Sequence, residues 1–297
     1  MESNIFSTKV YGYDGTMLNC LNVLHEDPKA IILYVHGYAD HSSRWLHVFD
    51  RLFYSGYSVY APDQRCHGKS EGRLGVIRSM YDWVEDIDIM VKYIYTLHPR
   101  KPVILFAHSA GGLAAALYVI NKRNNLTGLV LSAPAVSSDL SPLAQKTSWL
   151  LSKIVPHLGI VYTGSDDMLT HDSGIVEASR NDPLFYKGRI MAITGYALVR
   201  GTLDLKKRLH EISLPLLVLQ GTADKYVSPD GSRLLFEKAS SGDKTFIPYD
   251  GFYHEIFNEV EREKPLSDLM EWLEKRYGSR KGVLLEKPAE EAFQVEV

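Results

Sequence analysis

One serine of the sequence is flanked in the way that a nucleophile at the edge of a sheet requires. Ser109 follows the apolar run 103–107 and precedes Ala110, two glycines and a helical pattern. A strand, a sharp turn and a helix in this order form a nucleophile elbow, in which small neighbours of the serine avoid a clash. The first of these neighbours is Ala107 and not the usual glycine, so the pattern reads A-x-S-x-G. The alternative is a serine that only caps a helix.

A base for this serine is expected late in the chain. Where a serine on an elbow is activated, the nucleophile, an acid and a histidine follow one another in that order. Of the eleven histidines, His254 is the one beyond the last expected strand, on a loop before a helical stretch. It could take the hydroxyl proton as Ser109 attacks a carbonyl carbon. The alternative is a solvated loop histidine.

The acid is expected directly after another strand. Asp224 follows the apolar run 214–219 and a short loop. Its carboxylate could accept a hydrogen bond from Nδ1–H of His254, fix the tautomer and stabilise the imidazolium. The alternative is a turn aspartate that bonds to its own backbone. Asp250 suits the role less well, because it is too close to His254 in sequence to approach the ring from its far side.

Two backbone N–H groups are expected to face the oxyanion that forms during attack on a carbonyl. One belongs to Ala110, which follows the nucleophile, and the other to a loop after an early strand. That loop contains Gly37, which allows close approach to the substrate, and the N–H of Tyr38 is the expected second donor.

The same early loop permits a metal site as an alternative. Five side chains of suitable type occur there and after the next strand: His36, Asp40, His41, Asp63 and His67. A common metallohydrolase pattern is H-x-H-x-D-H, and Tyr38 replaces its middle histidine. A metal site would also leave Ser109 and His254 without a role, so we expect no metal and no organic cofactor.

The elements that position these residues predict an α/β fold with a mostly parallel central sheet flanked by helices. Apolar strand patterns alternate with helical ones: the expected strands are 30–35, 57–61, 102–107, 128–132, 214–219 and 244–247, and the expected helices 80–98, 113–121 and 265–277. The alternation stops after residue 134 and resumes at 214. We therefore divide the chain into a first core part (1–134), a helical cap without strands (135–207), a second core part (208–278) and a partly ordered tail (279–297).

The cap carries a group of apolar residues with two interpretations. Its members are Trp149, Leu150, Leu151, Ile154, Val155, Leu158, Ile160 and Val161. We favour burial of this group against the core, as in an amphipathic helix. The alternative is an exposed apolar rim that admits lipid or touches a membrane surface.

Composition excludes several classes of protein. The net charge of −3 and scattered basic residues argue against nucleic acid as a partner. Two cysteines are too few for a disulfide framework and lack metal-site spacing. Neither a secretory signal nor an apolar stretch of the ~20 residues that cross a bilayer is visible. We therefore expect a cytoplasmic protein, with peripheral membrane contact through the cap if the rim is exposed.

Taken together, these motifs resemble the monoglyceride lipase group of the α/β-hydrolases, which also includes lysophospholipase-like members. The resemblance covers about residues 8–277 and rests on His36-Gly37, His41-Ser42-x-Arg44, Asp63-x-x-x-His67-Gly68-x-Ser70-Glu71-Gly72, His108-Ser109, Gly111-Gly112, Asn181-Asp182-Pro183-Leu184, Gly221-x-Ala223-Asp224 and Tyr253-His254-Glu255-Ile256-Phe257-Asn258-Glu259. The departures are Ala107 and Cys66 where glycine is usual, and Tyr38 where the residue is often small.

The resemblance implies an α/β-hydrolase fold, catalytic Ser109, Asp224 and His254, oxyanion donors Tyr38 and Ala110, and a cap over an acyl tunnel. For the substrate, which is expected to be a small lipid-like ester, we predict contacts with Leu151, Ile154 and Leu158 of the cap. Asp40 and Arg44 are predicted to pair and to shape the head-group end. The alternative for that pair is a structural salt bridge.

The predicted reaction is hydrolysis of a monoacylglycerol to fatty acid and glycerol through an acyl-enzyme. Lysophospholipase or broad carboxylesterase activity is the alternative among esterases, and a binding protein without turnover is the alternative outside enzymes. A peptidase needs an acidic pocket for the substrate amine, which the sequence does not reveal. Acyl transfer to an alcohol and the oligomeric state stay open.

Overall fold

The computed structural model describes residues 5–122, 125–136, 141–162 and 166–278. These residues build an eight-stranded sheet with the order β1-β2-β4-β3-β5-β6-β9-β10. From β4 to β10 every neighbouring pair is parallel, whereas β2 is antiparallel to both β1 and β4. The predicted α/β-hydrolase fold with a mostly parallel sheet is confirmed. The predicted tail, 279–297, lies outside the described residues.

Six strands of the sheet correspond to the six predicted runs, with ends displaced by no more than two residues. They are β3 (Ile31–Val35), β4 (Ser58–Pro62), β5 (Val103–His108), β6 (Gly128–Ser132), β9 (Leu216–Gly221) and β10 (Lys244–Tyr249). In β3 and β5 alternate side chains enter two separate apolar cores, one on each face of the sheet. Burial on both faces explains why these strands read as unbroken apolar runs.

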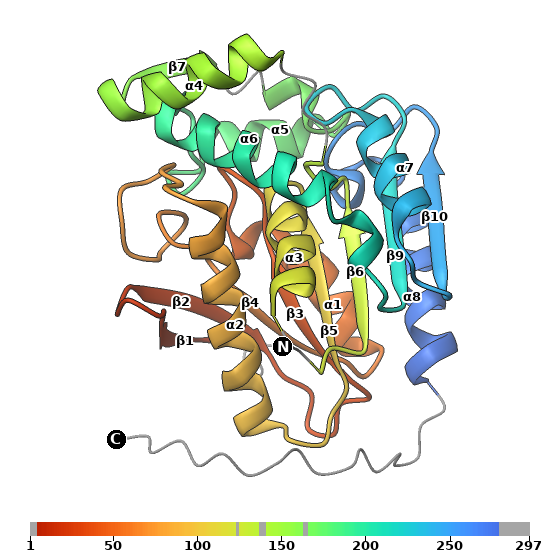
Figure 1. Ribbon diagram of the computed structural model, residues 1–297. Helices are drawn as coiled ribbons and strands as arrows, with labels where there is room; N and C mark the ends of the chain where they lie inside the picture. Colours follow the sequence, from red (N-terminus) through yellow and green to blue (C-terminus); the bar gives the residue numbers. More distant parts are fainter. Residues whose placement is uncertain (1–4, 123–124, 137–140, 163–165, 279–297) are drawn as a thin grey trace.

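Helices cover both faces of the sheet (Figure 1). One face carries α2 (Met80–Leu97), α3 (Ala110–Asn121) and α7 (Pro229–Lys238), and the other carries α1 (Leu46–Tyr54) and α8 (Glu263–Tyr277). The helix predicted over 80–98 is α2, and the hydroxyl of its N-cap residue Ser79 accepts a hydrogen bond from the N–H of Tyr81.

The described part of the chain between β6 and residue 207 lies beyond the carboxyl ends of the strands (Figure 1). It contains α4 (Pro142–Ile154), α5 (Ser173–Asn181) and α6 (Ala192–Lys206). Helix α6 packs on α3, and α4 packs on α6. Its role as a cap and the domain limits at 134, 207 and 278 remain predictions.

Two expectations about the strands were wrong. The segment 135–207 is not free of strands, because β7 (Gly159–Tyr162) and β8 (Arg189–Met191) form a small antiparallel sheet within it. The core also begins with β1 (Ile5–Tyr11) and β2 (Met17–Val23), which were not predicted. All four have exposed or half-buried positions, and β1, β2 and β8 include polar residues that interrupt the apolar pattern of the central strands. Strand β7 is apolar but only four residues long.

The favoured interpretation of the apolar group in the cap was also wrong. Trp149, Leu150, Ile154, Leu158 and Val161 are between 45% and 66% exposed. Leu151, Val155 and Ile160 are half-buried. Most of the group therefore forms an exposed rim, which was the alternative interpretation.

Candidate active site

Ser109 sits on a turn of unusual backbone conformation between β5 and α3. Its φ of 54° and ψ of −120° lie in a region that residues with a side chain rarely adopt. Hydrogen bonds from the N–H groups of Leu113 and Ala135 to the Ser109 carbonyl hold the turn. Gly111 lies so close to β3 that a Cβ there would stand 2.4 Å from two carbonyl oxygens. This packing explains the glycine at position 111 of the motif.

The three side chains predicted to form the triad lie in one hydrogen-bonded row. Nε2 of His254 is 2.8 Å from Oγ of Ser109, and Nδ1 is 2.7 Å from Oδ2 of Asp224. An ionised Asp224 only accepts hydrogen bonds, so Nδ1 carries the proton and Nε2 accepts from the serine hydroxyl. This is the tautomer in which an imidazole can act as a base toward Ser109.

The approach of His254 to Asp224 depends on a glycine at the end of β9. A Cβ at Gly221 would lie 2.3 Å from the carbonyl oxygen of Tyr253 and 2.4 Å from that of Phe252. The N–H of Ala223 also donates to the carbonyl of Phe252, at 3.0 Å. The base loop, defined as residues 252–259, therefore passes directly over the strand that carries the acid.

Electrostatics favour an ionised acid beside a basic imidazole. Burial opposes ionisation of Asp224, but His254 and the backbone N–H groups of Val227 and Tyr226 lower its pKa. Burial likewise opposes protonation of His254, yet its pKa is raised by the Asp224 carboxylate, and further by Glu255 and Asp40. The imidazole can therefore hold a proton taken from Ser109.

The backbone N–H groups of Tyr38 and Ala110, the predicted oxyanion donors, have no acceptor among the described residues, and their role stays a prediction. Nε2 of His36 accepts from the N–H of Gln64 at 2.8 Å, so Nδ1 donates to the Gly37 carbonyl at 2.7 Å. That carbonyl belongs to the same planar peptide as the Tyr38 N–H, so this hydrogen bond fixes the direction of the donor.

The side chain of Tyr38 turns toward a neighbouring loop. Its hydroxyl donates to the carbonyl of Gly75 at 3.1 Å, and its ring packs edge-on against His67 and Tyr186. Cys66, the other departure from the family pattern in this region, has a φ of 63°, which glycine adopts without strain. Both departures lie in loops around the site, and the row of three side chains is intact beside them.

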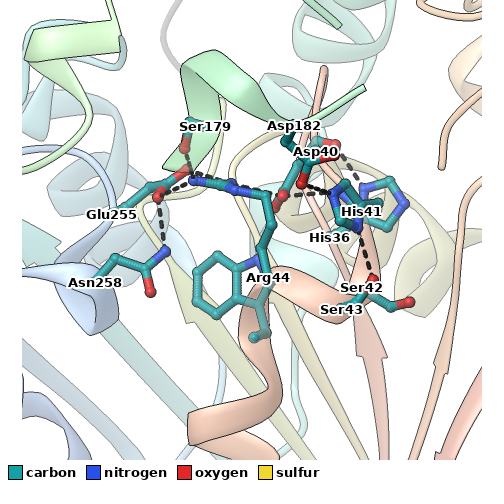
Figure 2. A network of polar contacts seen from close by, with 12 residues as sticks. His36, Asp40, His41, Ser42, Ser43, Arg44, Ser179, Asp182, Glu255 and Asn258 are labelled. Atoms are coloured by element: carbon teal, nitrogen blue, oxygen red, sulfur yellow. Dashed lines mark hydrogen bonds and ion pairs between the residues drawn. The ribbon is translucent and has the colours of Figure 1, made fainter. Parts of the chain in front are cut away.

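Asp40 and Arg44 pair, at 2.7 Å, but both side chains are buried, with exposed fractions of 4% and 8% (Figure 2). Glu255 forms the second ion pair of the guanidinium, at 2.8 Å. Sequence reasoning missed this partner, although it follows His254 directly and belongs to a motif that carried the resemblance. The salt bridge was the alternative interpretation, and a role at the head-group end stays a prediction.

The predicted acyl-chain residues lie in the cap, where Ile154 and Leu158 are exposed and Leu151 is half-buried. Their contact with substrate stays a prediction. Asp250, the less suitable acid, accepts from Thr222 at 3.1 Å and not from His254.

The side chains of the alternative metal site have other partners. Asp63 accepts from Ser42 and Asn19, and His41 pairs with Asp182. Burial lowers the pKa of His67 to about 3, so its ring is neutral at ordinary pH. In the described part of the chain, no three or more histidine, cysteine or carboxylate groups are arranged to hold a metal ion.

A serine hydroxyl bonded to a buried histidine–aspartate pair, on this fold, defines a serine hydrolase. Comparison with known proteins agrees: the family model described as serine aminopeptidase, S33, matches residues 26–261. A monoacylglycerol lipase of Mycolicibacterium smegmatis is 34% identical over 250 residues, which cover 83% of this chain and 89% of that protein. A phospholipase of Bacillus subtilis is 32% identical over 243 residues, covering 80% and 92%.

Structural comparison gives the same grouping. The crystal structure of Paleococcus ferrophilus monoacylglycerol lipase has a TM-score of 0.76 and 29% identity, covering 91% of this chain and 98% of that one. The chain therefore belongs to the serine aminopeptidase S33 family of α/β-hydrolases, within its monoglyceride lipase-like group of ester hydrolases. The predicted resemblance is confirmed. Among the described residues, no helix has the length and apolar character needed to cross a membrane.

Proposed function

We propose that this protein hydrolyses monoacylglycerols to a fatty acid and glycerol through an acyl-enzyme on Ser109. The observation that carries the proposal is the row of hydrogen bonds from Oγ of Ser109 through the His254 ring to Oδ2 of Asp224. The lipase names of the relatives supply the substrate class.

In the proposed first step, Oγ of Ser109 attacks the ester carbonyl carbon while Nε2 of His254 takes the hydroxyl proton. The N–H groups of Tyr38 and Ala110 stabilise the negative carbonyl oxygen, and each such donor is worth ~10²–10³ in rate. The tetrahedral intermediate collapses, and the imidazolium gives its proton to the departing glycerol oxygen. Water then attacks the acyl-enzyme with His254 again as base, which releases the fatty acid and restores Ser109.

The cap is proposed to deliver the lipid from a membrane surface in the cytoplasm. Its exposed rim includes Trp149 and Ile154, and the segment 141–162 contains Lys146 and Lys153 but no acidic residue. An apolar face with basic neighbours binds the interface of a membrane with anionic lipids.

A lysophospholipase is the second candidate, because the Bacillus subtilis relative carries a phospholipase name. A panel of monoacylglycerols, lysophospholipids and short p-nitrophenyl esters separates the candidates. We expect the highest kcat/KM with monoacylglycerols.

The proposed mechanism is tested with Ser109→Ala and a fluorophosphonate probe. We expect wild type to form one adduct on Ser109 and the variant to lose at least ~10³-fold in kcat. Activity that survives in Ser109→Ala contradicts the mechanism. A wild-type protein that binds the esters but neither reacts with the probe nor turns them over is the binding protein of the non-enzyme alternative.

A further inference from the structure

Arg44 stands where three separate parts of the chain meet. It forms a two-fold ion pair with Glu255, Nη1 to Oε1 and Nη2 to Oε2, both at 2.8 Å. Nη1 also donates to Oδ1 of Asp40 at 2.7 Å, and Nη2 donates to Oγ of Ser179 at 2.9 Å. The guanidinium thus joins the loop after β3, the base loop and helix α5 of the cap (Figure 2).

The two loops that Arg44 joins carry the base and a proposed oxyanion donor, which must keep a fixed position relative to each other. Arg44 and Asp40 follow Tyr38, the proposed oxyanion donor, on one loop, and Glu255 follows His254 on the other. Asp40 is itself fixed, because its Oδ2 accepts from Nε1 of Trp45 at 2.7 Å. Glu255 is fixed as well, by Asn258 through Oε2 at 2.7 Å and by its own N–H to the Leu169 carbonyl at 2.8 Å.

Burial makes this connection stiff. The side chains of Arg44, Asp40 and Glu255 are 8%, 4% and 3% exposed. Although burial opposes a charged guanidinium, the two carboxylates raise the pKa of Arg44 further above its ordinary value. A two-fold Arg–carboxylate pair fixes direction as well as distance, and neither partner has water to turn to if the other moves.

We propose that Glu255, held by Arg44, is a positioning residue that keeps the base of His254 and the oxyanion donor of Tyr38 in one geometry. The proposal rests on the function proposed above and adds two residues to it. Neither Glu255 nor Arg44 touches the reacting atoms. They act through the loops that carry His254 and Tyr38.

The network also contributes to the charge around the base. Its two carboxylates and one guanidinium leave one net negative charge, and Glu255 and Asp40 both raise the pKa of His254, after Asp224. The other groups that face the imidazole are Ser109, Asp224, His108 and Tyr226. Burial and the proximity of His254 lower the pKa of His108 to about 3, so His108 is uncharged through the working range of pH.

The test compares Glu255→Gln and Arg44→Gln with a matched buried pair elsewhere. Arg65 and Asp86 also pair twice, at 2.6 Å each, with side chains 10% and 2% exposed, but they do not join the two loops. The controls are therefore Asp86→Asn and Arg65→Gln. Each of the four variants is measured for kcat, KM and the pH profile of kcat/KM with a soluble p-nitrophenyl ester.

We expect both network variants to lose ~10–100-fold in kcat, with KM changed by less than ~3-fold, because a small misplacement affects the transition state most. The acid limb of kcat/KM should move to lower pH in Glu255→Gln, which loses a negative charge, and to higher pH in Arg44→Gln, which loses a positive one. The control variants should lose thermal stability without either change.

Unchanged kcat and acid limb in Glu255→Gln, or equal changes in Asp86→Asn, overturn the inference. If the single variants do not fold, the double variant Arg44→Met/Glu255→Leu replaces the pair by apolar groups and should fold but still lose kcat. A double variant with wild-type kcat also overturns it. In each variant Ser109→Ala must still abolish activity; if it does not, the proposed function fails and not this inference.

Discussion

The two halves of the cap differ in what they touch. Around α5, the segment 169–172 contacts the base loop. Oγ1 of Thr170 donates to the Asn258 carbonyl at 2.8 Å, and the His171 ring stacks on the Tyr253 ring with 3.7 Å between the ring centroids. Leu169 and Phe185 in this half are buried. Around α4 and β7, by contrast, Trp149 and Ile154 are 45% and 66% exposed.

This difference shows that the cap is not uniform. Its α5 half shares buried polar groups with the loop that carries His254, so it can hardly move without moving the base. Its α4–β7 half packs on α6 and leaves its apolar side chains exposed. We infer that the α5 half serves the geometry of the site, whereas the α4–β7 half is the part available to a lipid surface.

The largest effect is expected at Asp224, which binds the base His254 on the loop that the α5 half contacts. His254 must be neutral to accept a proton, and its pKa is raised above the ordinary histidine value of 6.5. We therefore expect the acid limb of kcat/KM to lie above pH 6.5. Asp224→Asn removes the carboxylate that raises this pKa and favours the wrong tautomer. We expect kcat to fall ~10⁴-fold and the acid limb to move to lower pH. An acid limb that stays in place contradicts the assignment of Asp224.

The next effect concerns the attachment of the α5 half. Glu259 is 3% exposed and accepts from the N–H of Tyr253 at 2.8 Å, the N–H of His171 at 3.0 Å and Nδ1 of His171 at 2.9 Å. Glu259→Gln should lower the free energy of unfolding in urea by about 2–3 kcal/mol, because charge-assisted bonds are lost. Glu261→Gln, on an exposed pair with Lys264, is the control and should change it by less than ~0.5 kcal/mol.

The smallest effect on the protein itself is expected in the α4–β7 half. Trp149→Ser combined with Ile154→Ser should weaken binding to anionic lipid vesicles ~10-fold, since both side chains are available for burial in the interface. Stability should change by less than ~0.5 kcal/mol, and activity on a soluble ester should be unchanged. Tyr54→Ser removes a side chain of α1 that is 66% exposed and serves as the control. Equal vesicle binding of all three proteins would remove the functional difference between the halves.

Local patterns made the central strands and the three candidate catalytic residues predictable. β3, β5 and β9 are buried on both faces, so their apolar composition alone identifies them as strands. Ser109 and Asp224 each follow such a strand closely, whereas His254 follows the half-buried strand β10. Strand β1 was missed because much of it is exposed and polar residues interrupt it, whereas β7 is apolar but only four residues long and lies in the segment that was expected to be helical. The exposed rim has the same composition as a buried face, and sequence cannot tell the two apart.

The partner of Arg44 could not be predicted, for a different reason. Glu255 lies 211 residues away from Arg44, and apart from its place beside His254 nothing local distinguishes it from the exposed Glu261 or Glu263. Long-range ion pairs follow from the folded path of the chain. The adjacent His254 was a signal, because a charged group beside a base is expected to influence it.

The backbone conformation of Ser109 has a consequence for evolution and engineering. A residue with a side chain at φ 54° and ψ −120° costs about 1–3 kcal/mol, which glycine in the same place would largely avoid. Selection for stability alone would therefore favour an inert molecule with glycine at this position. Stabilising the protein without loss of turnover requires changes elsewhere, because the reactive hydroxyl and the most relaxed chain are mutually exclusive at the elbow.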